Sequence, residues 1–226
     1  MTLIHHLPTY EKPREKALQF GIDSLSNSEL LALLIRNGTK EHSALDIARE
    51  LLDKSGGVGN LSSSSIKELT SVKGISNVKA LELQAVFTLL KRISFENIER
   101  KDVIQSQRSF LQWLKLKIGF EKIENFMVVY LDNANHIINY KILFKGTVNY
   151  AMIYPREIVK EALLSNAVSM ILVHNHPSQN ISPSKEDYEI TKRILEACKL
   201  LEINVLDHLI VTGQDCYSIL FDKSFH

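Results

Sequence analysis

The segment from Val168 to Val173 is an almost unbroken apolar run, and it constrains the fold more than any other part of the chain. Such a run is typical of a central strand that is buried within a sheet. Patterns typical of strands surround it, and two stretches nearby have the spacing of helices. We therefore expect an α/β (α+β) domain, in which helices pack against a mixed sheet. The expected strands span residues 125–132, 136–145, 146–153, 168–173, 203–211 and 216–220, and the expected helices 155–166 and 184–201.

The first hundred residues have helical patterns instead. Ser26 followed by Glu29 forms a capping-box pattern that opens an apolar run, and Asn37-Gly38 ends it. Further helices of this part are expected over residues 43–52, after Ser65 and over 77–92. A helix over 109–117 is expected to begin the second domain. The polar stretch 95–107 has no periodicity and is interpreted as a linker. We predict a helical domain at 1–101 and a sheet-containing domain at 102–226.

Composition excludes several classes of protein. The 226 residues are 45% hydrophobic and 23% charged, with a formal net charge of +1, so bulk charge does not indicate a nucleic-acid binder. No apolar run is long enough to cross a bilayer, so we expect no membrane association. The two cysteines, Cys198 and Cys216, favour a reducing cytoplasm over a disulfide framework.

The sequence HNHPSQNISPSKED, residues 174–187, follows the apolar strand directly. Residues i and i+2 of an extended chain face the same side, so the imidazoles of His174 and His176 can reach one point. Asp187 lies in the first turn of the next helix. Two histidines and one carboxylate leave the fourth position of a tetrahedral zinc ion to water, which is the pattern of a catalytic site. Such a zinc ion makes hydroxide available near neutral pH.

A structural explanation exists for part of this motif. Ser184 as N-cap and Asp187 in the first turn also fit an ordinary helix start without any metal. That explanation does not account for two histidines at the end of an apolar strand. His208, beside Asp207, is a fourth ligand, a partner that orients a ligand, or, as we expect, structural. Arg156 could contact a substrate carboxylate, but a surface salt bridge is expected, and Cys198 is expected to be a small core residue.

The motif resembles the JAMM signature of the JAB/MPN metallo-hydrolases: a distant Glu, then His-x-His-Pro, then Ser three residues before Asp. The chain is similar over nearly its whole length to the RadC family, or UPF0758 group. The stretches that carry this resemblance are residues 13–15, 25–31, 143–147, 155–157 and 206–210. The resemblance implies a cytidine-deaminase-like sheet with flanking helices, preceded by a small helical domain.

The resemblance also implies roles for individual residues. His174, His176 and Asp187 would bind one zinc ion, and Ser184 would donate a hydrogen bond to the developing oxyanion. Glu124 matches the family's general base, with Glu121 and Glu157 as alternatives. Two positions depart from the family pattern: Tyr154 stands where His is usual, and Gln179 stands where Gly is usual.

Residues 69–80 resemble a helix-hairpin-helix element, in which a hairpin presents backbone N–H groups to DNA phosphates. Gly74 occupies one glycine position, but Ser76 replaces the second. Lys73 and Lys79 would add contacts to phosphate that do not depend on base sequence. The alternative is a hairpin that only packs a small domain.

Two functions from different classes follow. The first is a zinc-dependent hydrolase that cleaves amide bonds in peptides or proteins, as a metallopeptidase or isopeptidase does. The second is a DNA-associated protein in which the metal domain is a nuclease or a scaffold. Ligation by two histidines and one aspartate favours zinc and carbonyl chemistry over the hard cations of phosphate chemistry. A domain without metal that only mediates contacts is the third possibility.

Overall fold

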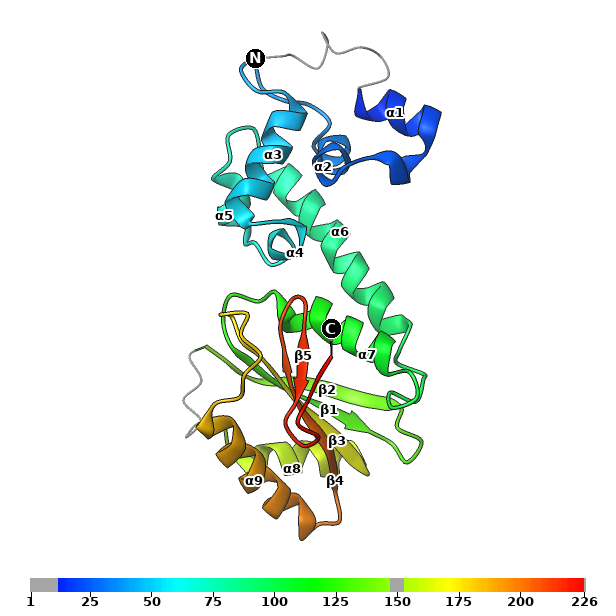
Figure 1. Cartoon of the computed structure of the whole chain (residues 1–226), viewed down its shortest axis with the longest axis vertical. Coiled ribbons are helices and arrows are strands. Elements are labelled where there is room, and N and C mark those ends of the chain that lie inside the picture. The colour runs from blue at the N-terminus through cyan, green and yellow to red at the C-terminus, as the bar shows by residue number, and fades with distance from the viewer. Residues whose placement is uncertain (1–11, 147–152, 226) are drawn as a thin grey trace. The chain divides into compact units, whose positions relative to one another are not determined.

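The computed structural model describes residues 12–146 and 153–225 (Figure 1). The chain divides into two compact units, Met1–Leu89 and Leu90–His226, and each is described by itself. None of the helices in the described ranges has the length and apolar character that crossing a bilayer requires.

The first unit is helical, as the sequence predicts. Serines at three helix starts, Ser26, Ser43 and Ser65, each complete a capping box with an acidic residue three positions later. These boxes satisfy backbone N–H groups that have no partner within the helix. The helices are α1 (Pro13–Phe20), α2 (Asn27–Ile35), α3 (Ala44–Ser55), α4 (Val58–Leu61), α5 (Ile66–Thr70) and α6 (Asn77–Glu96), which extends past the first unit.

The hairpin between α5 and α6 requires glycine at position 74. Gly74 has φ of +99°, and a Cβ atom there would lie 2.5 Å from Cδ1 of Ile47. Both the backbone conformation and the close approach exclude a larger residue. Ile47 belongs to the buried core of this unit, so the hairpin closes directly over that core.

The polar stretch 95–107 is not the linker that the sequence indicates. Ile98 and Val103 are almost completely buried, and they join Phe95 in a core cluster of the second unit. Isolated apolar residues in a polar segment give no periodic signal, which explains the error. Helix α7 (Gln107–Leu114) follows and continues into a π-helical turn at Lys115–Gly119.

The second unit contains a six-stranded mixed sheet with the order β2-β1-β3-β4-β5-β6. Strands β3 and β4 are parallel, and the other neighbours are antiparallel. The prediction of a mixed α/β domain is therefore confirmed. The strands are β1 (Asn125–Leu131), β2 (Ile137–Lys145), β3 (Ser169–Asn175), β4 (Asn204–Val211), β5 (Cys216–Ser218) and β6 (Lys223–Phe225), and the helices that follow α7 are α8 (Pro155–Leu164) and α9 (Lys185–Lys199).

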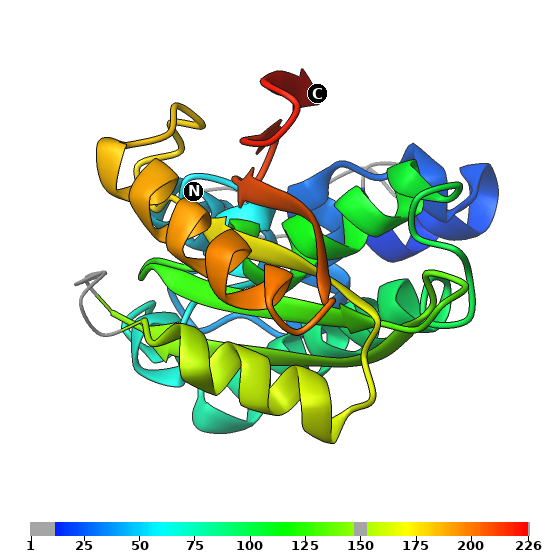
Figure 2. The same ribbon diagram turned by 90° about the horizontal axis from the view of Figure 1, so that it is seen from below.

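Helices cover both faces of this sheet. Helix α7 packs on one face, whereas α8 and α9 pack on the other (Figures 1 and 2). Alternate residues of β1 and β3 fill the two cores, which explains why every residue of both strands is buried. Cys198 of α9 lies in the second core, and burial raises the pKa of its thiol to about 11, in agreement with a packing role. Of the extended segment expected at 146–153, residues 147–152 lie outside the described ranges.

Candidate metal centre

The candidate ligands lie where β3 ends and α9 begins. Strand β3, helix α9 and the parallel strand β4 form a crossover unit, and the turn after β3 returns the chain over the sheet. Ligands in such units commonly bind beyond the carboxyl ends of the strands. The sequence therefore folds so that His174 and His176 at the strand end meet Asp187 at the helix start.

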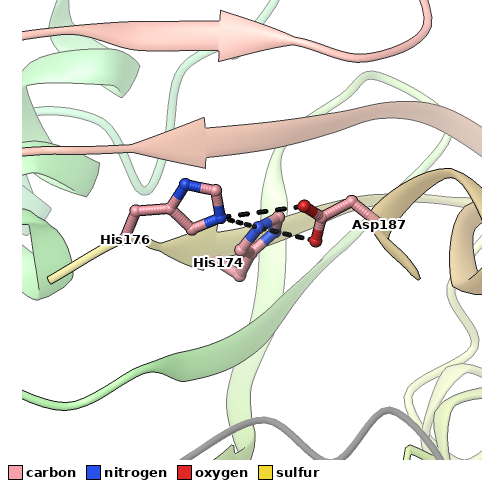
Figure 3. A group of neighbouring side chains, drawn as sticks. All are labelled: His174, His176 and Asp187. Atoms are coloured by element: carbon pink, nitrogen blue, oxygen red, sulfur yellow. Dashed lines mark hydrogen bonds and ion pairs between the residues drawn. The ribbon is translucent and has the colours of Figure 1, made fainter. Parts of the chain in front are cut away.

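The three side chains point toward one another (Figure 3). Nε2 of His174 lies 3.0 Å from Nε2 of His176 and 3.0 Å from Oδ1 of Asp187. Nε2 of His176 lies 3.7 Å from Oδ2 of Asp187. One ligand atom from each residue lies within 4.8 Å of the others, so the group could hold a metal ion.

The tautomer of His176 follows from its second nitrogen. Nδ1 lies 2.6 Å from the backbone oxygen of Asn180. A carbonyl oxygen can only accept a hydrogen bond, so Nδ1 of His176 must carry the proton. With its proton on Nδ1, the uncharged ring of His176 would present the lone pair of Nε2 to a metal ion.

His174 has a buried partner at its other nitrogen. Nδ1 of His174 lies 2.8 Å from Nε2 of His208, and Nδ1 of His208 lies 2.5 Å from the hydroxyl of Thr191. Burial, together with the neighbouring His174, lowers the pKa of His208 well below its ordinary value, so this ring is neutral. His208 is therefore a partner of the site through His174. Asp207 is not involved, because its Oδ1 accepts from Ser218 and from two backbone N–H groups.

The two explanations of Asp187 are compatible, because its two oxygens have different contacts. Oδ2 lies 2.7 Å from the backbone nitrogen of Ser184 and 2.7 Å from its hydroxyl, which completes the capping box of α9. Oδ1 lies beside His174. The cap thus orients the carboxylate toward the histidines.

The hydroxyl of Ser184 is engaged in the same box. It donates to Oδ2 of Asp187 and accepts from the backbone nitrogen of Asp187 at 3.1 Å. A hydroxyl has only one proton to donate. Ser184 must therefore release Asp187 before it can donate to the oxygen of a substrate.

Distance separates the three candidates for the general base. Oε1 of Glu124 lies 4.0 Å from Nε2 of His176. Glu121 instead contacts Lys91, with 3.5 Å between Oε1 and Nζ. Glu157 lies on α8, where its carboxylate is 3.3 Å from Nε of Arg156 in a largely exposed ion pair. The distance to His176 therefore favours Glu124 as the base.

Asn175 lies between the two histidines and holds the segment that carries Glu124. Its Oδ1 accepts from the backbone nitrogen of Asn125 at 2.8 Å and from that residue's Nδ2 at 3.2 Å. Its Nδ2 donates to the backbone oxygens of Glu121 and Ile123 at 3.2 and 3.1 Å. This residue was not predicted from the sequence. A fully buried amide on the opposite side of the strand from the histidines is the signal that could have identified it.

Replacing Asn175 with alanine is expected to lower the free energy of unfolding by about 1–3 kcal/mol, because buried polar groups lose their partners. Amide hydrogen exchange at Asn125 should accelerate, while the metal ligands remain in place. Asn175→Asp is the matched control, since it retains an acceptor for Asn125 but removes the two donated bonds. An unfolding midpoint and exchange rate equal to those of the wild type in Asn175→Ala would contradict this role.

Comparison with known proteins agrees with the fold. A family model described as a RadC-like JAB domain matches residues 104–224, and one described as UPF0758 N-terminal matches residues 4–81. The chain belongs to the RadC family. UPF0758 proteins of Pseudoalteromonas translucida and Cellvibrio japonicus are 41% and 42% identical to it, each over 94% of this chain and 95% of the relative. One of Bacillus pumilus is 38% identical over 96% of this chain and 97% of the relative.

Membership of the RadC family confirms the resemblance, and the JAB domain is consistent with a metal at the cluster. Gln179, which departs from the usual glycine, has φ of +61°, a conformation that favours glycine. Its side chain compensates by donating to the backbone oxygen of Gly119 and accepting from the backbone nitrogen of Gly213. The other departure, Tyr154, is half exposed and stacks under Arg156.

The residues expected to contact DNA are engaged within the first unit. Nζ of Lys73 pairs with Glu41, and Nζ of Lys79 donates to the backbone oxygens of Asn37 and Gly74. A phosphate would have to replace these partners. The contacts agree with a packing role for the hairpin in this RadC protein.

Proposed function

We propose that the second unit is a zinc-dependent hydrolase that cleaves amide bonds in peptides or proteins. The observation that carries this proposal is the convergence of two imidazole Nε2 atoms and one carboxylate oxygen, with a second carboxylate close by. Ligand atoms on a tetrahedral zinc ion lie about 3.3 Å apart, given bonds of about 2.0 Å. Nε2 of His174 lies 3.0 Å from Nε2 of His176 and 3.0 Å from Oδ1 of Asp187, close to that value. The contact of 3.7 Å between Nε2 of His176 and the carboxylate is made by its other oxygen, Oδ2, and one ligand atom from each residue lies within 4.8 Å of the others.

Each residue has a distinct task in this proposal. Zinc, when bound, supplies a Lewis acid that polarises the scissile carbonyl and makes water more acidic. His174, His176 and Asp187 would hold the ion, as three protein ligands do in catalytic zinc sites. Glu124 accepts a proton from the attacking water at its carboxylate and passes it to the leaving nitrogen.

Ser184 stabilises the oxyanion after its hydroxyl turns from Asp187 to the substrate. The backbone nitrogen of Ser184 still donates to Oδ2 after that movement, so the carboxylate retains one of the two bonds that fix it. The turn therefore does not release the metal ligand.

The donor set favours amide over phosphodiester hydrolysis. Cations that serve phosphate chemistry prefer oxygen ligands, whereas two imidazoles favour zinc. The intramolecular contacts of Lys73 and Lys79 add no support for a DNA substrate. We therefore do not propose a nuclease.

The test is hydrolysis by zinc-loaded, full-length protein of two peptide libraries, one linear and one joined through lysine isopeptide bonds. We expect cleavage in at least one library, loss of cleavage after removal of the metal by a chelator, and recovery with one equivalent of zinc. Serine-protease inhibitors should have no effect. Cleavage that survives complete metal removal, or activity confined to phosphodiesters, would contradict the proposal.

A further inference from the structure

Thr191 lies one helical turn beyond Asp187 on α9 and is only 3% exposed. Its hydroxyl oxygen lies 2.5 Å from the backbone oxygen of Asp187 and 2.5 Å from Nδ1 of His208. Nε2 of His208 lies 2.8 Å from Nδ1 of His174. A continuous buried chain therefore connects the backbone of one proposed ligand to the ring of another.

The end of this chain at a carbonyl oxygen determines the donor in each hydrogen bond from Thr191 to Nδ1 of His174. The oxygen of Asp187 can only accept, and two oxygens 2.5 Å apart need a proton between them. Thr191 therefore donates its single hydroxyl proton there, a bond to residue i−4 that threonine commonly forms in helices. Its oxygen remains only an acceptor, so Nδ1 of His208 donates. His208 is fully buried, and its two nitrogens meet a hydroxyl and another imidazole rather than a carboxylate, an environment that disfavours a charged ring. Its Nε2 then accepts, and His174 donates from Nδ1.

We propose that Thr191 is a positioning residue that sets the tautomer of His174 through His208. With its proton held on Nδ1, the ring of His174 would offer a metal ion the lone pair of Nε2, the atom that faces Asp187 and His176. The opposite tautomer carries a proton on Nε2, which blocks metal binding. The effect on zinc rests on the proposed function, but the protons on Nδ1 of His174 and on Nδ1 of His208 exist in the metal-free protein, where Nε2 of His174 lies 3.0 Å from Oδ1 of Asp187.

This chain also affects the charge of the site. A metal-bound histidine is often oriented by a carboxylate, which adds a negative charge beside the ligand. Here the outer partners of His174 are a neutral imidazole and a hydroxyl. They fix the ring without adding charge, so zinc bound to a single carboxylate retains a net positive charge to polarise a carbonyl.

Two substitutions separate the hydroxyl from the shape of the side chain. Thr191→Val has nearly the same volume but has no hydroxyl, whereas Thr191→Ser retains the hydroxyl and lacks the methyl group. Nitrogen-15 NMR of the histidine rings in zinc-free, full-length protein reports each tautomer directly. We expect a proton on Nδ1 of His174 and on Nδ1 of His208 in the wild type and in Thr191→Ser. In Thr191→Val the proton of His208 should move to Nε2, because its Nδ1 has lost its acceptor, and Nδ1 of His174 should then lose its proton.

Zinc affinity, measured by competition with a chelator, gives the second result. We expect Thr191→Val to bind zinc about 10- to 100-fold more weakly than the wild type, as for other losses of an outer partner, and Thr191→Ser to restore the affinity. Unchanged tautomers in Thr191→Val, or changed tautomers without loss of affinity, would overturn the proposal. If the tautomers change as expected but the wild type binds no zinc, the tautomer control stands and the proposed hydrolase fails.

Discussion

Replacing His174 with alanine is expected to abolish binding of zinc. His174 is buried, and its Nε2 lies 3.0 Å from Nε2 of His176 and 3.0 Å from Oδ1 of Asp187. It is therefore the central member of the cluster. Loss of an outer partner costs about 10- to 100-fold in affinity, and loss of a direct ligand should cost more. Metal analysis after dialysis should give about one zinc per wild-type chain and close to none for His174→Ala.

His136→Ala is the matched control, because His136 pairs with Asp132 in the turn between β1 and β2. This variant should retain the zinc content of the wild type. Circular dichroism should show that both variants are folded. Equal zinc in His174→Ala and the wild type would remove His174 from the ligand set.

Replacing Glu124 with glutamine is expected to leave zinc in place and to lower kcat by about 10²- to 10⁴-fold, the usual effect of losing a general base. Glutamine has the same shape as glutamate, but its amide is too weakly basic to act as a general base. Glu124 lies 4.0 Å from His176, within reach of a water molecule between them. Zinc content and the rate of peptide cleavage should be measured on the same preparations.

The two alternatives for the base provide matched controls. Glu121→Gln removes a partner of Lys91, and Glu157→Gln removes a partner of Arg156, so neither should lower kcat more than a few-fold. If Glu121→Gln instead has the large effect, the assignment of Glu124 is wrong. Loss of zinc in Glu124→Gln would indicate a ligand rather than a base.

Local patterns predict most of the fold. The apolar run before His174 forms the central strand, and the capping-box residues begin helices as expected. Strand β6, only three residues long, was not predicted because such a segment has no period to recognise. The error at 95–107 has a related cause: Ile98 and Val103 are buried by contacts with distant segments, and their polar neighbours conceal this.

The candidate site likewise has residues that local patterns predict and residues that depend on tertiary structure. The i, i+2 spacing of His174 and His176 and the helix start at Asp187 are local features, so the sequence predicted the cluster. Thr191 was not predicted, although it lies on the same face of α9 as Asp187. Its role depends on His208 in β4, which only tertiary structure brings beside His174. The choice between candidate bases also depended on tertiary distances.

X-ray absorption at the zinc edge, on full-length protein with one equivalent of zinc, tests the central claim most directly. The predicted result is one site with four nitrogen or oxygen neighbours at about 2.0 Å, scattering from two imidazole rings, and no zinc–sulfur distance near 2.3 Å. The signal from one imidazole should disappear in His176→Ala. A shell that contains sulfur, or one without imidazole, would contradict the account.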